Sequence, residues 1–348
     1  MELGLYTFGE MTPDPASGAT ISAEWRIAEV IEAAQLADEA GLDVYGIGEH
    51  HRPDFAGAAP PVILAAIAAT TKRIRLTSTV TVLSTDDPVR VFQQFATLDL
   101  ISGGRAELMA GRGVFLEPFT LFGQNTASYD EIFAEKLDLL LKLRDEERVT
   151  WSGRHRPALV NQPVHPRPNQ KKLPVWIGVG GTAFSAARAG FLGLPMAIGI
   201  IGGDPATFAS LAMLHRRGAV EGGHDPEQIP LSINMHGFVA DSFAEAADTF
   251  FPPYAAFMTG IGRERGWAPV TRDHFDRMTG PSGSMLIGTP LQVAEKIIRN
   301  YEIFKNERCL IQLSAGTIPH EKIMRAIELF GTKVAPIVRD RLGQNVLP

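Results

Sequence analysis

The feature that most constrains the fold of this chain is a regular alternation of short apolar runs with helical segments along its 348 residues. Runs rich in β-branched and aliphatic residues predict strands, and apolar residues three or four apart predict the helices between them. Parallel strands joined by helices produce this pattern. The predicted strands are Leu3–Phe8, Val44–Ile47, Arg75–Leu83, Ala106–Ala110, Val175–Val179, Met196–Ile201, Leu231–Val239 and Cys309–Ser314.

Eight such strands are the number that closes a (β/α)8 barrel, or TIM barrel, whereas a doubly wound sheet more often has about five to seven. We therefore expect an α/β fold with a single barrel domain over residues 1–348. The connections 113–173 and 240–285 are longer than the others, which predicts insertions after strands 4 and 7. Loops that follow barrel strands lie on the catalytic face, so the second insertion is either a lid over the active site or a plain surface insertion.

Charge and cysteine content exclude several classes of protein. The net charge of −6 lacks the basic footprint that nucleic-acid phosphates require. The single cysteine, Cys309, excludes an internal disulfide and a cysteine-rich zinc site. The uncharged stretches 55–71 and 189–203 are shorter than a membrane span of about 20 residues, and no basic region precedes an apolar run at the N-terminus. We expect a soluble cytoplasmic protein with no nucleic-acid or membrane partner.

The sequence Glu49-His50-His51 follows the second predicted strand, where barrel enzymes place catalytic groups. Neighbouring side chains on a strand face opposite ways, so the two histidines are poorly placed to share an ion, and we expect no metal site. His50 is either a hydrogen-bonded histidine at a strand end or an acid–base group, because its ordinary pKa lies near neutral pH. Glu49 either orients a histidine ring or accepts from a backbone N–H group.

Two further features at strand ends could bind an anion. Val179-Gly180-Gly181-Thr182 leads directly into a helical segment, so its backbone N–H groups and the helix N-terminus could bind a phosphate. Arg112 closes the fourth strand between two glycines and offers a forked set of donors. Either feature has an ordinary structural reading, as a tight strand-to-helix turn and as a surface arginine. Ser78, Thr79 and Thr81 place hydroxyls on the third strand, where β-branched residues are common for structural reasons.

The order of these motifs resembles the bacterial luciferase-like flavin monooxygenases over nearly the whole chain. The resemblance rests on Glu49-His50-His51, Ile74-Arg75-Leu76, Asp87-Pro88-Val89-Arg90, Ser102-Gly103-Gly104-Arg105, Gly111-Arg112-Gly113, Pro174-Val175-Trp176-Ile177-Gly178, Gly193-Leu194-Pro195-Met196, Gly288-Thr289-Pro290 and Ile327-Glu328-Leu329-Phe330-Gly331.

The resemblance implies a (β/α)8 barrel that binds FMN at the carboxyl ends of its strands. In the family, reduced FMN comes from a separate NAD(P)H:flavin reductase and activates O2 as a C4a-peroxyflavin, which oxygenates a small organic substrate. By position, His50 matches the family's active-site histidine, and Glu49 lies beside it. The other carried-over residues would bind the cofactor: Thr79 and Val80 at the flavin ring, and Arg112, Val179, Gly180, Gly181 and Thr182 at its phosphate. The family likeness also suggests a homodimer, packed through helices near the second and third strands.

Some positions depart from luciferase itself. Gly111 stands where luciferase has a cysteine, Gly178 where it has an acidic residue, and Ile200 where it has an aromatic residue, so light emission from an aldehyde is not implied. We expect a pocket lined by Met196, Ile198, Ile200 and Phe8. Alternatives are a dehydrogenase that uses the deazaflavin F420, a non-catalytic flavin-binding subunit and, as an outsider, a metal-dependent hydrolase. The substrate is not predicted.

Overall fold

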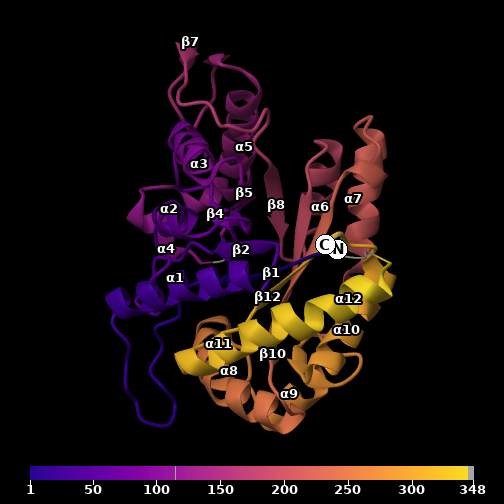
Figure 1. The fold of residues 1–348 in the computed structure, drawn as a ribbon. Helices are drawn as coiled ribbons and strands as arrows, with labels where there is room; N and C mark the ends of the chain where they lie inside the picture. Colours follow the sequence, from indigo (N-terminus) through magenta and orange to yellow (C-terminus); the bar gives the residue numbers. More distant parts are fainter. Residues whose placement is uncertain (114, 344–348) are drawn as a thin grey trace.

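The computed structural model describes residues 1–113 and 115–343, and its centre is a closed barrel of parallel strands surrounded by helices (Figure 1). Each predicted strand is present, which confirms the (β/α)8 barrel. The eight barrel strands are β1 (Glu2–Thr7), β2 (Val44–Ile47), β3 (Arg75–Ser78), β5 (Ala106–Gly111), β8 (Val175–Val179), β9 (Met196–Ile200), β10 (Leu231–Val239) and β12 (Arg308–Gln312).

The barrel closes because the first and last strands pair. Gly4 of β1 lies opposite Val44 of β2 on one side and Leu310 of β12 on the other. Around the rest of the ring, each strand pairs in parallel with its neighbours, and β10 joins β9 to β12. All eight carboxyl ends therefore open toward the same end of the barrel.

Helices form the outer layer, and those between strands return the chain to the start of the next strand (Figure 1). Side-chain caps begin some of these helices: the Asp87 side chain accepts from the Val89 N–H, with Pro88 as the first helical residue, and Gly103 ends the same helix in a left-handed conformation. The outer helices are α1 (Ala23–Glu39), α2 (Pro60–Thr70), α3 (Pro88–Ser102), α5 (Tyr129–Asp145), α6 (Ala183–Phe191), α7 (Ala209–Glu221), α10 (Pro290–Phe304), α11 (His320–Leu329) and α12 (Ala335–Arg341).

Two separate cores follow from the alternation of side chains along the strands. The large core lies between the barrel and its helices and takes the aliphatic residues that point outward. Small clusters fill the inside, one around Tyr6, Val44 and Leu310 and another around Met109 and Trp176. Near the carboxyl ends of the strands, some of the side-chain positions that face into the barrel are glycines, and these leave room for a cavity.

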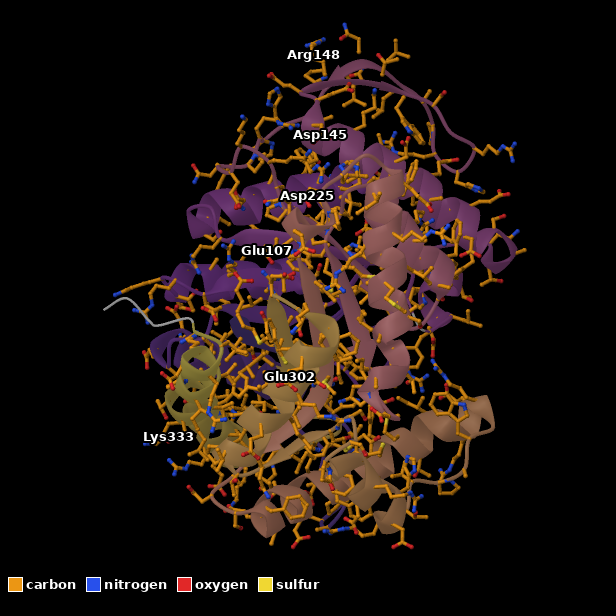
Figure 2. All side chains as sticks on the ribbon, turned by 90° about the vertical axis from the view of Figure 1, so that its right-hand side faces the viewer. Glu107, Asp145, Arg148, Asp225, Glu302 and Lys333 are labelled. Carbon is orange, nitrogen blue, oxygen red and sulfur yellow. The ribbon has the colours of Figure 1, made fainter. Side chains whose placement is uncertain are left out.

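Charged side chains fill the end of the barrel where the strands begin. Arg308, at the start of β12, is 1% exposed and donates to Glu107 of β5 over 2.7 Å and to Glu2 of β1 over 2.8 Å. Its guanidinium also lies 4.2 Å from the centre of the Trp176 ring. Burial of the ions is offset by these paired contacts, which leave the guanidinium well supplied with acceptors. Figure 2 shows Glu107 near the middle of the molecule, whereas Arg148 lies at a remote edge.

Both predicted insertions are present. The first holds α4 (Glu117–Leu121), α5 and an antiparallel hairpin of β6 (Arg148–Trp151) and β7 (Leu159–Pro163), which projects away from the barrel in Figure 1. The second holds α8 (Phe243–Arg265) and α9 (Arg272–Thr279), and directly after it the short strand β11 (Leu286–Gly288) pairs with the end of β10. In the described part of the chain, no helix is long and apolar enough to cross a membrane.

Candidate active site

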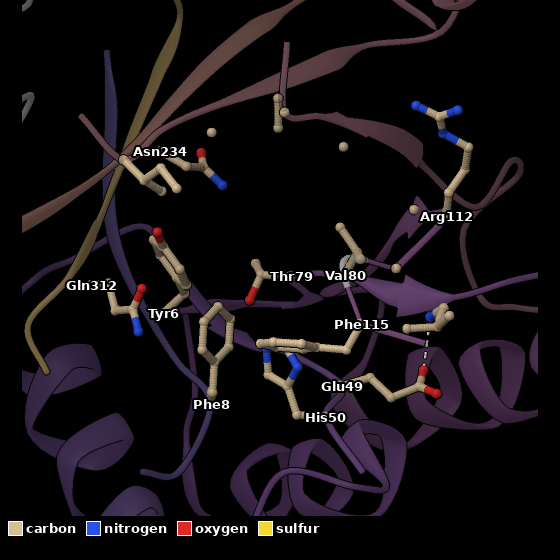
Figure 3. A pocket seen from close by; sticks show the side chains of 18 of the residues that line it. Tyr6, Phe8, Glu49, His50, Thr79, Val80, Arg112, Phe115, Asn234 and Gln312 are labelled. Atoms are coloured by element: carbon tan, nitrogen blue, oxygen red, sulfur yellow. Dashed lines mark hydrogen bonds between the residues drawn. The ribbon is translucent and has the colours of Figure 1, made fainter. Parts of the chain in front are cut away.

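A cavity of about 520 Å³ lies at the carboxyl ends of the barrel strands, and both insertions contribute to its walls (Figure 3). It brings together most of the site residues predicted from the sequence. Those that line it are Glu49, His50, Thr79, Val80, Arg112, Val179, Gly180 and Thr182. Gly181 lies in the same turn, with a positive φ of 136°, but is not part of the cavity wall.

His50 lies in an aromatic wall of this cavity (Figure 3). Its ring stacks on Phe55, with 4.4 Å between ring centres, and meets the edges of Phe8 and Phe115 at 4.4 and 5.2 Å. Desolvation by these rings lowers the pKa of His50 to about 3. The imidazole is therefore neutral at physiological pH, and one of its nitrogens donates while the other accepts.

Glu49 performs both roles that its sequence position left open, but it orients His51 rather than His50. One carboxylate oxygen lies 2.8 Å from His51 Nε2, and the other accepts from the Val82 backbone N–H over 2.8 Å. His51 packs against Phe122, away from the aromatic wall around His50. Glu49 thus connects the end of the second strand to the chain after the third.

Thr79 and Val80 fall in a break where the single predicted strand 75–83 divides into β3 and β4 (Thr81–Val82). Thr79 lines the cavity, and its Oγ1 is buried without a hydrogen-bond partner among the described residues. Val80 projects between two glycines: a Cβ added at Gly111 or Gly178 would lie 2.5 or 2.6 Å from its methyl groups. These two departures from luciferase therefore leave the space that the Val80 side chain occupies.

Arg112 lies at the outer end of the cavity, at the end of β5. It donates to Thr182 Oγ1 over 2.9 Å and pairs with Asp130 over 2.5 Å, while its guanidinium lies 5.2 Å from the centre of the Tyr129 ring. Asp130 has a side chain that is 72% exposed, so solvent can replace it readily. The guanidinium is thus available to an anion that displaces Asp130.

Thr182 precedes α6 but does not cap it through its side chain, because its hydroxyl accepts from Arg112 instead. The N-terminal end of α6 therefore lies next to Arg112, and its partial positive charge adds to that of the guanidinium. A Cβ added at Gly180 would meet no atom within 4 Å, so a ligand can approach this turn closely. We call Arg112, Gly180 and Thr182 the cationic end of the cavity.

The opposite side of the cavity carries polar residues that the sequence analysis did not identify. Strand pairing places Tyr6, Gln312 and His236 in one row across β1, β12 and β10, and Asn234 precedes His236 by two residues on the same face. All four are at least nine-tenths buried. The sequence did carry one indication of these residues: Ser232, Asn234 and His236 are polar at every second position of an otherwise apolar strand, which places them on one face. We call Tyr6, Asn234, His236 and Gln312 the neutral end.

The predicted apolar lining from the sixth strand is wrong. Met196, Ile198 and Ile200 belong to the core between barrel and helices, and the residues of this strand that reach the cavity are Ala197 and Gly199, followed by Ile201. Both faces of a barrel strand are buried, so hydrophobicity does not reveal which face points inward. Phe8 lines the cavity as predicted.

The second insertion covers the mouth of the cavity, with lining residues Phe257, Met258, Ile261, Arg265 and Trp267. Arg52, from the loop after β2, pairs with Glu264 of this cover over 2.5 Å and with Glu117 of the first insertion over 2.8 Å. The segment 240–285 therefore has the position of a lid, one of its two predicted roles.

Comparisons with known proteins agree with this geometry. A sequence profile described as luciferase-like monooxygenase matches residues 1–305. A monooxygenase from Streptomyces bottropensis aligns with a TM-score of 0.81 and 26% identity over 97% of this chain and 99% of its own. The oxygenating constituent of a diketocamphane monooxygenase from Pseudomonas putida, solved with FMN, has a TM-score of 0.80 at 20% identity, covering 97% and 98%.

A different cofactor occurs among the relatives. An F420-dependent glucose-6-phosphate dehydrogenase from Amycolatopsis mediterranei is 33% identical over 172 residues, which are 47% of this chain and 51% of the relative. The structure solved with FMN thus shares the fold of this chain, and the F420-dependent relative is similar in sequence to about half of it.

Proposed function

The chain belongs to the luciferase-like monooxygenase family, and from that premise we propose that it is a cytoplasmic monooxygenase that uses reduced FMN and O2. Its substrate would be a small organic molecule, and a separate NAD(P)H:flavin reductase would supply the reduced flavin. The observation that carries the proposal is the joint approach of Arg112 and Thr182 to one point beside Gly180, at the end of a cavity that also holds His50.

The residues of the cavity fit FMN. Arg112 and the start of α6 would bind the dianionic phosphate, with the Thr182 hydroxyl as a further donor. The flavin ring would lie against Val80, next to the unpartnered Thr79 hydroxyl. The open space at Gly180 and Gly199, where an added Cβ would meet nothing within 4 Å, gives the ring and its side chain room. FMN, when bound, supplies the redox chemistry that activates O2.

The protein's own side chains would control water and protons in this reaction. Phe8, Phe55 and Phe115 surround His50 and keep bulk water from the reacting atoms. Neutral His50 can donate one hydrogen bond and accept another without adding charge to the site. Glu49 would act indirectly, because it fixes the loop through Val82 and His51.

The test is a titration of the protein with oxidised and with reduced FMN, followed by admission of O2 while the absorption spectrum is recorded. We expect reduced FMN to bind and its reoxidation to differ in rate from that of the free flavin. A His50→Ala variant should keep FMN binding but reoxidise the flavin faster, because the aromatic wall then admits water. His274→Ala, on an exposed position of α9, is the matched control. Calorimetry that detects no flavin in either redox state would reject the proposal.

An F420-dependent dehydrogenase is the second candidate, favoured by the identity to the Amycolatopsis relative. The cationic end is compatible with the phosphodiester of that cofactor, because Arg112 lies at the outer end of the cavity, where an acidic tail could continue into solvent. Competition between F420 and reduced FMN for the protein separates the two candidates. Binding of F420 alone would favour the dehydrogenase.

A homodimer is also proposed, from the exposed apolar side chains on helices near the second and third strands. Val62 of α2 is 69% exposed, and Leu100 and Ile101 of α3 are about half exposed. Exposed aliphatic residues on neighbouring helices are typical of an interface between subunits. Light scattering should give twice the chain mass, and a Leu100→Asp, Ile101→Asp double variant should give the mass of one chain.

A further inference from the structure

We propose that Lys296 on α10 is a site of acylation, and that its amine takes the acyl group from an acyl phosphate. The residue lines a crevice of about 720 Å³ formed by residues of α8, α9, β11 and α10, on the outside of the barrel (Figure 1). This crevice shares no lining residue with the cavity of the candidate active site. Acylation of Lys296 is thus independent of the proposed function.

The Lys296 amine has two hydrogen-bond acceptors and no carboxylate partner among the described residues. Its Nζ donates to the backbone carbonyl oxygens of Thr279 over 2.7 Å and of Met285 over 2.6 Å, in the segment that ends the second insertion. A protonated amine has three donors, whereas a neutral amine has two donors and a lone pair. The two carbonyls therefore satisfy the neutral form and leave its lone pair free to attack an electrophile.

The surroundings of the amine favour this neutral form. Burial, together with the charge of Arg299, lowers the pKa of Lys296 to about 8. The charged groups that line the crevice around it are Arg272 and Asp276 of α9 and Glu295 and Arg299 of α10. Arg272 is paired with Asp248 and with Asp276, over 2.8 Å in each case. About a quarter of the Lys296 amine is then neutral at pH 7.5, against roughly one part in a thousand for an ordinary lysine.

Arg299 supplies the second half of the site. It follows Lys296 by three residues on α10, so the two side chains share one face of the helix. One of its nitrogens donates to the Pro281 carbonyl oxygen, and another lies 3.7 Å from the Asp204 carboxylate, which is longer than a hydrogen bond. Donors of the guanidinium are thus left for the oxygens of a phosphate group. In an acyl phosphate such a group is joined to an electrophilic carbonyl carbon, which the neighbouring amine can attack.

The reaction transfers the acyl group without oxidation or reduction. The Lys296 nitrogen forms a bond to the carbonyl carbon, and the bond from that carbon to the phosphate oxygen breaks. Inorganic phosphate leaves with the bonding electron pair, and the proton lost from the nitrogen passes to water. The product is an uncharged amide, and the crevice has room for a small acyl group.

The test is incubation of the whole protein with acetyl phosphate, followed by digestion and mass spectrometry of the lysine-containing peptides. At pH 7.5 we expect Lys296 to be acetylated about tenfold faster than Lys171, an exposed lysine. This gain is smaller than the ratio of neutral amines, because a less basic and half-buried amine attacks more slowly. The Lys296 rate should level off above about pH 8, whereas the rate of an ordinary lysine rises about tenfold per pH unit to about pH 10.

The role of the guanidinium is tested by substitution. Arg299→Gln should slow acetylation of Lys296 by acetyl phosphate about tenfold, the lower value for a hydrogen bond to a charged group. With p-nitrophenyl acetate, an uncharged donor, the same substitution should change the rate about twofold at most, through the pKa of Lys296. Arg217→Gln, on an exposed position of α7, is the matched control and should be acetylated like the parent.

Equal acetylation of Lys296 and Lys171 in the parent at pH 7.5 would overturn the proposal, and this comparison needs no variant to fold. A Lys296 rate that keeps rising about tenfold per pH unit to about pH 10 would also overturn it, because the amine would then be an ordinary one. Equal slowing of both acetyl donors by Arg299→Gln would overturn the assignment to acyl phosphates, since the guanidinium would then not bind the phosphate.

Discussion

The two ends of the cavity use opposite electrostatic designs within one barrel. At the cationic end, Arg112 is partly exposed and pairs with the exposed carboxylate of Asp130. At the neutral end, burial removes charge from His236 and leaves hydrogen bonds as the means of recognition. An exposed charge binds an ionic group at little desolvation cost, whereas a buried neutral group discriminates by the cost of leaving it unpaired. The comparison indicates that the charge of a ligand group determines which end of the cavity it occupies: an anionic group the cationic end, and an uncharged polar group the neutral end.

The largest test of this contrast is removal of the guanidinium. Arg112→Met should weaken FMN binding on the order of 50-fold, because charge-assisted hydrogen bonds to the phosphate are lost. Flavin fluorescence titration measures the effect at low and high salt. The parent should lose affinity with salt more steeply than the variant does, since screening acts on the exposed charge. Arg90→Met, on an exposed position of α3, should behave like the parent.

The next test lowers the pH to charge the neutral end. The pKa of His236 is about 4 in the fold and about 6.5 in the unfolded chain, so below pH 6.5 the unfolded chain binds more protons. Stability is therefore present above pH 6.5 and is lost as the pH falls toward 4. Between pH 7 and pH 5 the free energy of unfolding should drop by about 2 kcal/mol from this group alone.

Urea denaturation at both pH values measures this drop. His50, whose pKa is lowered to about 3, adds a contribution of the same sign. His236→Gln should reduce the pH dependence, whereas His274→Gln, on the exposed α9 position, should leave it as in the parent. If the free energy of unfolding of His236→Gln changes between pH 7 and pH 5 as much as that of the parent, the His236 ring is charged in the folded protein at pH 5.

The smallest expected effect is on FMN affinity, when the charge of Asp130 at the cationic end is removed. Asp130 occupies the guanidinium of Arg112 and would oppose an incoming phosphate by like charge. Asp130→Asn should therefore tighten FMN binding about threefold, the scale of an exposed ion pair. Calorimetric titration of the parent and the variant would detect the change. Weaker binding by the variant would mean that Asp130 helps to orient Arg112 instead of competing for it.

The sequence was most informative where chain order and local chemistry decide the structure. Alternation of strands with helices predicts the barrel, and position after a strand predicts that His50 and Arg112 share one face. It was least informative about orientation within a strand. Met196, Ile198 and Ile200 were assigned to the wrong face because barrel strands are apolar on both sides. The neutral end was missed because strand register, which aligns Tyr6 with Gln312 and His236, depends on long-range pairing.

The charged residues at the end of the barrel where the strands begin affect the order in which ligands bind. Arg308, Glu107 and Glu2 fill that end, so ligands reach the cavity from the mouth, beneath the segment with which Arg52 pairs. The flavin and the organic substrate of the proposed function would then share one entrance. Because the cavity is closed at its other end, two ligands would enter one after the other, and the second to enter would block release of the first.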